Sequence, residues 1–439
     1  MAVFINPRDR FLTDDLCLYR DLPHHKTDYP ALEENAKADI CVIGGGFTGV
    51  LSACYLAQAG FDVILLERHR IGWGASGRNS GQAIPGFNWD IRGIAARHGE
   101  ELAAQAYKAT LDALLDLKSH VLKSGIACDW QPGLVMAGKT EKSVKDLEDY
   151  KETVKRLCGH HLEMIDAARM EQMLGTGTYR GGLLDDEAGR FNPLKYVNGM
   201  ADMAVKAGVR IYEETPALSL EKTAGGKVSI NTPRGTVTCA KTILAGDAYQ
   251  GWLMPDLRAK YVLLRTSMLA TRRFTDDEYA QTIPADKAVF EWRSLLNYFT
   301  KTADGRLIFG GGDAPLSRSE AERRRAFTAI VRSMEEIFPH LKAIHITHWW
   351  GGYFSVTRDQ VPEIGCIDNA FYYAFGYSGH GVVPSHMAAR LMAEMIIRKE
   401  ESPAFVKAMK APPIPGAGRC DGLLVRCALQ WYRVKDMFS

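Results

Sequence analysis

The sequence predicts an α/β protein, α+β overall, in which a βαβ domain is joined to a domain built on an antiparallel β-sheet. Three observations lead to this prediction. Two short apolar runs, 40–43 and 63–66, flank a glycine-rich turn and a small-residue segment, as in a βαβ unit. A second glycine turn, 376–381, leads into another helix-like segment, and residues 258–345 alternate strand-like segments. A chain of 439 residues also favours two domains over one core.

The first glycine turn has the spacing of a dinucleotide-binding fingerprint. Gly44 allows a tight turn, Gly46 lets the backbone approach a pyrophosphate, and Gly49 lets the helix pack closely on the strand. Glu67 ends the second apolar run, where a ribose hydroxyl needs an acceptor. The alternative is a glycine-rich turn without a ligand. The binding residues predicted in this unit are Gly44, Gly46, Phe47, Thr48, Gly49, Glu67 and Arg68.

The segment after Glu67 favours FAD over NAD. It is polar and rich in glycine, and it offers many unhindered N–H groups to a pyrophosphate and a ribityl chain. The distant second turn suits a ligand too long for one loop, so an NAD-dependent dehydrogenase is disfavoured. The first loop contributes Gly74, Ala75, Ser76, Arg78, Asn79, Ser80, Gly81 and Gln82. The second turn contributes Gly376, Tyr377, Gly379, His380, Gly381 and Val382.

Four segments in this order resemble the FAD-dependent D-amino-acid oxidase superfamily, which includes glycine oxidase and sarcosine oxidase. They are GWGASGRNSGQ, DGRLIFGGG, WWGGYFSVTRDQVPEIG and GYSGHG, and they are most similar to the γ-glutamylputrescine oxidase-like branch. The resemblance implies a Rossmann-like FAD-binding domain with an antiparallel β-sheet substrate domain above the flavin. It implies contacts from Ala217 to the adenine and from Ala245 and Gly246 to the cofactor. It also implies oxidation of an amine or amino acid, with O2 as acceptor and H2O2 as product.

The predicted domains are discontinuous. Residues 1–36 are expected to form an arm over the surface. The FAD-binding domain is predicted to comprise 37–95, 190–257 and 346–439, and the substrate domain 96–189 and 258–345.

Periodicity predicts the elements between the glycine turns. The expected helices are 49–59, two within 91–124, 144–157, 166–174, 191–207 (with Asn192 and Pro193 at its start) and 317–338. The expected strands are 128–137, 209–212, 262–271, 288–293, 295–300, 306–310 and 371–374, with a meander 218–221, 227–232 and 236–239 that 242–246 closes. The amphipathic tail 423–438 is expected to dock on the FAD-binding domain, the alternative being a membrane surface.

Flavin-dependent amine oxidation needs no obligatory protein base, so few catalytic side chains are predicted. His380 is the first candidate, because it lies at a turn that feeds a helix N-terminus and could stabilise charge on the flavin. The alternative is a turn cap. On the strand 295–300, alternation directs either Tyr298 or Asn297 toward the flavin, and Tyr298 is the preferred candidate. The alternative is that Tyr298 only packs in the sheet.

Other candidates have a structural interpretation beside the functional one. Arg293 and Arg358 could bind a substrate carboxylate, but ion pairs are expected more often. Trp349 and Trp350 could line an apolar pocket or pack in the core. The irregular set His340, His345 and His348 lacks a zinc pattern, so no metal is predicted.

The flavin is predicted to be non-covalent. In some relatives a cysteine on the strand before the T-x-D motif, or a histidine after a tryptophan in the first loop, forms the tether. Aligned on Thr357 to Asp359, the first position is Gly352, and Trp73 is followed by Gly74. Glycine has no nucleophile, and Cys366 lies beyond the strand end.

Composition limits the remaining classes of function and partner. The net charge of +2 argues against a nucleic-acid partner and against an FAD module for RNA modification. Nine scattered cysteines are expected to be reduced thiols in a cytoplasmic protein. No signal peptide or membrane span is predicted. An amine or amino-acid dehydrogenase that passes electrons to a quinone or carrier remains an alternative.

Overall fold

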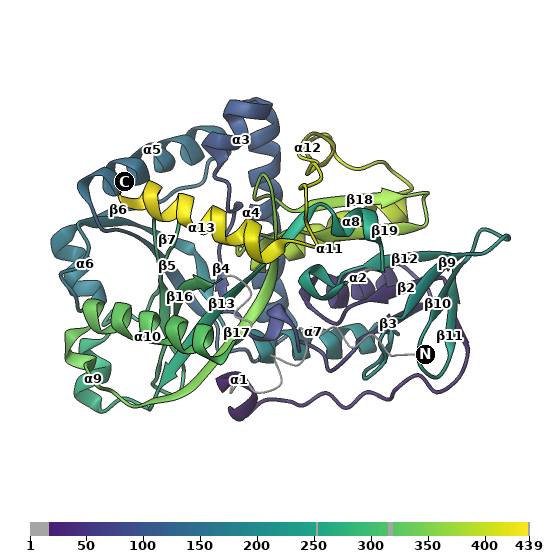
Figure 1. Cartoon of the computed structure of the whole chain (residues 1–439), viewed down its shortest axis with the longest axis horizontal. Coiled ribbons are helices and arrows are strands. Elements are labelled where there is room, and N and C mark those ends of the chain that lie inside the picture. The colour runs from purple at the N-terminus through teal and green to yellow at the C-terminus, as the bar shows by residue number, and fades with distance from the viewer. Residues whose placement is uncertain (1–16, 252, 315–318, 438–439) are drawn as a thin grey trace.

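The computed structural model describes residues 17–251, 253–314 and 319–437, and it contains two large sheets that lie side by side (Figure 1). The first has six strands in the order β18-β19-β12-β2-β3-β8, parallel except for the antiparallel edge strand β18. Their bounds are β2 Ile40–Ile43, β3 Val63–Leu66, β8 Arg210–Tyr212, β12 Lys241–Leu244, β18 Glu363–Ile367 and β19 Phe371–Phe375. This is the predicted βαβ arrangement.

Both faces of the six-stranded sheet are covered, which explains why β2, β3 and β19 are uninterrupted apolar runs. Helices α2 (Phe47–Gln58), α7 (Pro193–Lys206) and α11 (Val382–Arg398) form one core with it. A four-stranded sheet covers the other face with a second core that includes Val228, Ile230 and Val237. Its order is β1 (Ala36–Lys37), β11 (Thr236–Cys239), β10 (Val228–Asn231) and β9 (Ser219–Lys222).

The second large sheet has nine strands and is antiparallel except where β14 and β5 pair in parallel. Its main path is β17 (Ile346–Thr357), β13 (Tyr261–Thr271), β16 (Leu307–Ala314), β15 (Tyr298–Lys301), β14 (Ala288–Glu291), β5 (Gln131–Gly138), β7 (Gly181–Arg190) and β4 (Gln82–Ala83). Strand β6 (Glu163–Asp166) pairs with β7. One face packs Phe299 and Phe309 with α10 residues Ile330 and Met334, and the other shares the core of the six-stranded sheet.

The predicted helices form with small shifts at their ends. They are α3 (Ile91–His98), α4 (Glu100–Lys123), α5 (Glu141–Cys158), α6 (Ala167–Leu174) and α10 (Glu320–Ile337). The short helix α9 (Asp276–Gln281) is not among the predicted helices. The side chain of Asn192 accepts hydrogen bonds from the N–H groups of Leu194 and Lys195, and Pro193 takes the first helical position of α7. The sequence signal for this helix start is therefore confirmed.

Two expectations about strand pairing and one expected strand boundary differ from the structure. The segment 242–246 does not close the meander, because β12 pairs with β2 and β19 in the six-stranded sheet. Strand β17 was expected in the FAD-binding domain, yet it pairs along its length with β13 in the nine-stranded sheet. The predicted strand 295–300 starts only at Tyr298. The division of the chain into two domains stays a prediction, with β17 on the other side of the expected boundary.

Both ends of the described chain pack differently from expectation. Residues 17–19, in the predicted surface arm, are buried, and Tyr19 in α1 (Leu18–Asp21) contacts the ring of Trp350. The tail forms α13 (Asp421–Met437), whose Val425 and Leu429 pack on Leu264 of β13. It therefore docks on the nine-stranded sheet, and Phe438 lies outside the described residues (Figure 1).

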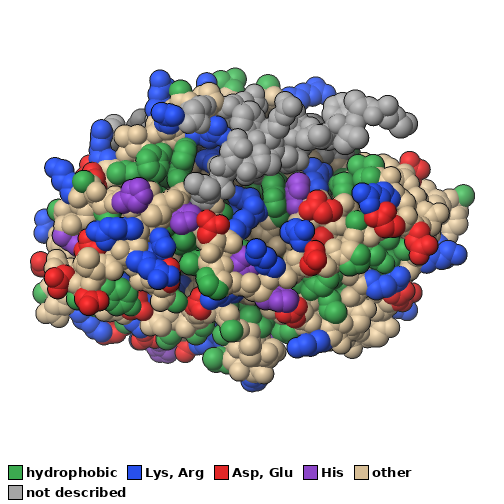
Figure 2. Space-filling view, turned by 90° about the horizontal axis from the view of Figure 1, so that it is seen from below, with side chains coloured by type: hydrophobic (Ala, Val, Ile, Leu, Met, Phe, Trp, Pro, Cys, Tyr) green, Lys and Arg blue, Asp and Glu red, His purple; other side chains and the backbone are tan. Residues whose placement is uncertain are grey.

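The surface matches the balanced composition. On the face in Figure 2, Lys and Arg side chains are interspersed with Asp and Glu side chains. Among the described helices, none is long and apolar enough to cross a membrane.

Candidate active site

The turn between β2 and α2 needs glycine at two positions. Gly44 has φ +114°, a backbone conformation that other residues rarely adopt. A Cβ on Gly49 would lie 1.9 Å from the carbonyl oxygen of Gly44, so only glycine lets the helix approach the turn. Gly44 itself packs against the backbone at Ala245, since a Cβ on Gly44 would lie 2.8 Å from the Ala245 carbonyl oxygen. The predicted roles of these two glycines fit the backbone geometry.

The first loop lies against the N-terminus of α2. The N–H of Phe47, the first helical residue, donates to the Ser76 hydroxyl at 3.0 Å. A Cβ on Gly46 would lie 2.8 Å from the same hydroxyl. Because a helix N-terminus carries unpaired N–H groups and a partial positive charge, this is a place for phosphate oxygens.

Glu67 lies at the end of β3 and faces the same turn. Its carboxylate accepts hydrogen bonds from the N–H of Gly45 at 2.6 Å and of His69 at 2.8 Å. Burial raises the pKa of Glu67, while these two N–H groups and the charge of the neighbouring Arg68 oppose the rise. The carboxylate is thus held beside the fingerprint, as a ribose acceptor must be.

The second glycine turn meets the first. The hydroxyls of Thr48 in α2 and Tyr377 share a hydrogen bond of 2.7 Å. Asp247, just after Gly246, accepts a hydrogen bond from the N–H of Gly376 at 3.0 Å. Burial raises the pKa of Asp247, and hydrogen bonds from Ser355 and Gly376 lower it. Three turns that are distant in sequence therefore converge at one edge of the six-stranded sheet, as ligand sites of parallel sheets do.

The rest of the first loop is held by its own side chains. Asn79 donates to the carbonyls of Ala75 and Ser76 and accepts from the N–H of Gly81 at 2.7 Å. Gln82 donates to the carbonyl of Val289 in the nine-stranded sheet. The loop is therefore rigid and joins the two sheets. Ala217 is buried between the six- and four-stranded sheets.

Arg78 has the most informative environment in the loop. Its side chain is buried, its Nε donates to the carbonyl of Trp73 at 2.7 Å, and both terminal nitrogens lack a hydrogen-bond partner among the described residues. An unsatisfied buried guanidinium is costly, so the site fits a ligand rich in acceptors. Together with the glycine cradle and the helix N-terminus, this donor set fits FAD.

Gly74 and Gly352, the two positions considered for a covalent tether, both lie beside Tyr249. A Cβ on Gly74 would lie 3.2 Å from the ring of Tyr249, and one on Gly352 would lie 4.0 Å from its hydroxyl. Cys366 lies in β18, at the edge of the six-stranded sheet.

His380 follows β19 of the six-stranded sheet, whereas Tyr298 begins β15 of the nine-stranded sheet. The imidazole of His380 donates from Nε2 to the carbonyl of Ile84 at 3.1 Å, and burial lowers its pKa, which favours the neutral ring. This contact is what the turn-capping alternative requires, and a charged His380 is disfavoured. Tyr298 shares a hydrogen bond of 3.0 Å with the Thr266 hydroxyl, and its ring covers Gly310.

The alternation of β17 separates the two tryptophans. Trp350 is fully buried toward the glycine loop, and its indole donates to the carbonyl of Arg78 at 2.8 Å. Trp349 packs instead on Phe327 of α10. Only Trp350 therefore lies near the candidate site.

The remaining candidates have structural contacts. Arg293 pairs with the buried carboxylate of Glu291, and Arg358 is exposed. The main-chain N–H of Asn297 donates to Glu291. His340 bonds the Thr282 hydroxyl and His348 bonds Asp21, while His345 is exposed. No group of metal-ligating side chains occurs in the described part of the chain.

Sequence reasoning missed Tyr19, Tyr249 and Asp247. Tyr19 lines a pocket of about 270 Å³ together with Ser80 of the glycine loop and Ile308 of the nine-stranded sheet. The polar lining of this pocket includes Arg190, Lys195 and Asp129. Nothing local in the sequence marks these positions, because their partners are far along the chain.

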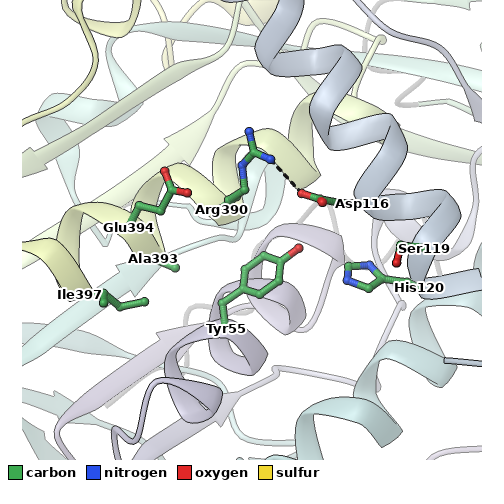
Figure 3. Close-up of a pocket in the computed structure, with 8 residues that line it drawn as sticks. All are labelled: Tyr55, Asp116, Ser119, His120, Arg390, Ala393, Glu394 and Ile397. Carbon is green, nitrogen blue, oxygen red and sulfur yellow. Dashed lines mark hydrogen bonds and ion pairs between the residues drawn. The ribbon is translucent and has the colours of Figure 1, made fainter. Parts of the chain in front are cut away.

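A second pocket, of about 350 Å³, lies between α2, α4 and α11 (Figure 3). Arg390 reaches Asp116 across it, with Tyr55 and His120 below (Figure 3). It shares no lining residue with the 270 Å³ pocket or with the glycine turns, so it is separate from the candidate active site.

Comparison with known proteins agrees with the geometry. A family model described as FAD dependent oxidoreductase matches residues 39–395. The chain belongs to this family. As an FAD-dependent oxidoreductase, it is 33% identical over 409 residues to gamma-glutamylputrescine oxidoreductase from Escherichia coli K12, covering 93% of this chain and 95% of the relative. It is 32% identical over 426 residues to the probable oxidoreductase OrdL of Haemophilus influenzae, covering 96% and 97%.

Solved structures share the fold. Glycine oxidase from Geobacillus kaustophilus has a TM-score of 0.71 at 18% identity and covers 86% of this chain and 99% of its own. L-Proline dehydrogenase from P. horikoshii has a TM-score of 0.70 at 20% identity, with coverages of 86% and 97%. The predicted superfamily and fold class are therefore confirmed.

Proposed function

We propose that this enzyme oxidises the C–N bond of an amine or amino acid to an imine and transfers the electrons to O2, which gives H2O2. The substrate is a γ-glutamylputrescine-like amine or a secondary or cyclic amino acid. The observation that carries the proposal is the similarity over nearly the whole chain to gamma-glutamylputrescine oxidoreductase. The convergence of three turns at one edge of the six-stranded sheet and the unpaired guanidinium of Arg78 support it.

Bound FAD supplies the chemistry by accepting a hydride equivalent from the carbon next to nitrogen. The chain's own residues would position the reactants. The helix N-terminus at Phe47 and the hydroxyl of Ser76 would hold the pyrophosphate, and Glu67 the ribose. Tyr298 and Thr266 would offer a hydroxyl pair to the substrate from the roof. Burial around Trp350 would exclude water.

We also propose that His380 acts on the flavin environment as a neutral group, and that Tyr298 contacts the substrate. The lowered pKa of His380 and its hydrogen bond to Ile84 support a neutral imidazole. His380→Ala should slow one flavin half-reaction in stopped-flow traces while the fold is retained. Tyr298→Phe should raise KM more than it lowers kcat. Stopped-flow traces and kinetic constants that match the wild type in these variants would assign both residues a structural role.

We propose that FAD is held without a covalent bond, because Gly74 and Gly352 offer no nucleophile. Retention then depends on phosphate, ribose and backbone contacts. Acid precipitation should release yellow FAD into the supernatant. Colour that stays in the washed pellet, with a peptide heavier by the flavin mass, would contradict non-covalent binding.

The acceptor needs its own experiment, because the similar proteins include both oxidases and dehydrogenases. A panel of amines and amino acids should be assayed for O2 consumption and H2O2 with the FAD-loaded protein. The proposal expects stoichiometric H2O2 with at least one panel member. Turnover only with a quinone or dye would replace it by the dehydrogenase alternative. The interspersed charges in Figure 2 disfavour the RNA-modification alternative. A cytoplasmic location remains part of the proposal.

A further inference from the structure

Arg78 is a buried cation whose charge the described residues do not balance. Its side chain is 3% exposed, and no carboxylate of the described chain forms an ion pair with it. Two other buried arginines form ion pairs, Arg190 with Asp286 and Arg258 with Asp421. A buried charge without a partner is strongly destabilising, so we expect a ligand to supply the compensating group.

The guanidinium is held in place by contacts on one side only. Its Nε donates to the carbonyl of Trp73, and its carbon lies 5.1 Å from the centroid of the Trp73 ring. The main-chain carbonyl of Arg78 accepts from the indole of Trp350 in β17. These contacts fix the group and leave its two terminal nitrogens to face the ligand, an arrangement that requires no reorganisation when charge develops.

The position of Arg78 relative to the glycine cradle decides which part of the ligand it meets. The pyrophosphate place is at the N-terminus of α2, beside Ser76. Arg78 instead lies under β17, where a Cβ on Gly352 would be 3.8 Å from its Cδ and 4.0 Å from the Tyr249 hydroxyl. An extended dinucleotide whose phosphates lie at α2 would bring its redox ring to this sheet.

We propose that Arg78 supplies the positive charge that balances the negative charge of the reduced flavin ring and thereby raises the reduction potential of the bound FAD. The charge acts on the reduced form more strongly than on the neutral oxidised ring, so it favours reduction. This inference rests on FAD binding and not on the identity of the amine.

The test uses FAD-loaded Arg78→Met and Arg78→Gln, which remove the charge, and Arg78→Lys, which keeps it. Arg97→Met is the matched control, because Arg97 forms an exposed pair with Asp359. Two readouts are the midpoint potential, from a reductive titration with a reference dye, and the dissociation constant of sulfite, which forms a negatively charged adduct with oxidised flavin. Circular dichroism checks the fold, and two charge-removing variants guard against one that does not fold.

The proposal expects a sulfite dissociation constant at least tenfold higher in the Met and Gln variants, and a lower midpoint potential. A tenfold change in the two-electron equilibrium corresponds to about 30 mV. The Lys variant should recover most of both values, and Arg97→Met should match the wild type. Unchanged potential and sulfite affinity in FAD-loaded Met or Gln variants would overturn the proposal. So would loss of FAD binding by folded variants at saturating FAD, because that result assigns Arg78 to the phosphates. Neither readout requires amine turnover, so failure of the proposed function is separately visible.

Discussion

The contact between Gly49 and Gly44 allows a quantitative test of the cofactor cradle. In Gly49→Ala the new Cβ would lie 1.9 Å from a backbone carbonyl oxygen, whereas ordinary contact begins at 3.4 Å. Helix α2 would have to move by about 1.5 Å, because neither partner is a flexible side chain. Overpacking of this kind costs about 3 kcal/mol, and the better helix propensity of Ala returns about 1 kcal/mol. We therefore expect a net loss of about 2 kcal/mol in unfolding free energy and weak FAD binding.

Gly225 and Gly46 provide comparison variants for Gly49→Ala. A Cβ on Gly225, in the turn before β10, would meet nothing within 4 Å, so Gly225→Ala should behave as wild type. A Cβ on Gly46 would meet the Ser76 hydroxyl at 2.8 Å, and that side chain can rotate. Gly46→Ala should therefore fold but bind FAD at least about tenfold more weakly, the factor equivalent to about 1.4 kcal/mol.

The assay is thermal and chemical denaturation of each apoprotein, followed by titration with FAD monitored by flavin fluorescence. Gly49→Ala should be the least stable of the three variants, and Gly46→Ala should differ from wild type only in FAD affinity. Wild-type stability and FAD content in Gly49→Ala would refute the close-packing argument.

Three further predictions concern single side chains. Glu67→Ala should weaken FAD by about 1.5–3 kcal/mol, the scale of a hydrogen bond to a charged group, and unchanged affinity in equilibrium dialysis would place the ribose acceptor elsewhere. Burial lowers the pKa of His386 in the folded protein to about 3, whereas the unfolded chain binds this proton near pH 6.5. The unfolded state is therefore favoured, and stability is lost, as the pH falls from about 6.5 toward 3. His386→Phe should flatten this loss by about 1.4 kcal/mol per pH unit in urea titrations, whereas the exposed His161→Gln should not. Tyr19→Ala should cost about 3 kcal/mol by opening a cavity beside Trp350 and should raise KM for the best substrate, and unaltered values of both would exclude Tyr19 from the site.

Local pattern was sufficient for most of the helices and strands and for most of the cofactor cradle, although it missed β7 and α9. The fingerprint at Gly44, Gly46 and Gly49 was readable because the spacing of a turn and its helix is set by backbone geometry within a few residues. The start of α7 at Asn192 was readable for the same reason, since a cap and its N–H donors are neighbours.

Strand partners and buried contacts could not be predicted from the sequence. Strand β17 follows the same alternation in either sheet, and only its pairing with β13 decides which sheet it joins. Tyr19 is an ordinary aromatic in an arm until it meets Trp350, more than 300 residues away. The spacing of residues along one sequence carries no information about such distant partners.

The sequence by itself determined the family, the cofactor and the residues of the glycine turns, because these depend on short-range geometry and on motif order. The tertiary structure decided that Asp247 joins two of the turns, that the tail docks on the nine-stranded sheet, and that His380 donates to the carbonyl of Ile84. It also decided that Arg78 is buried without a compensating charge. The physical reason is that burial and charge balance are properties of the whole assembled core, to which residues from every part of the chain contribute.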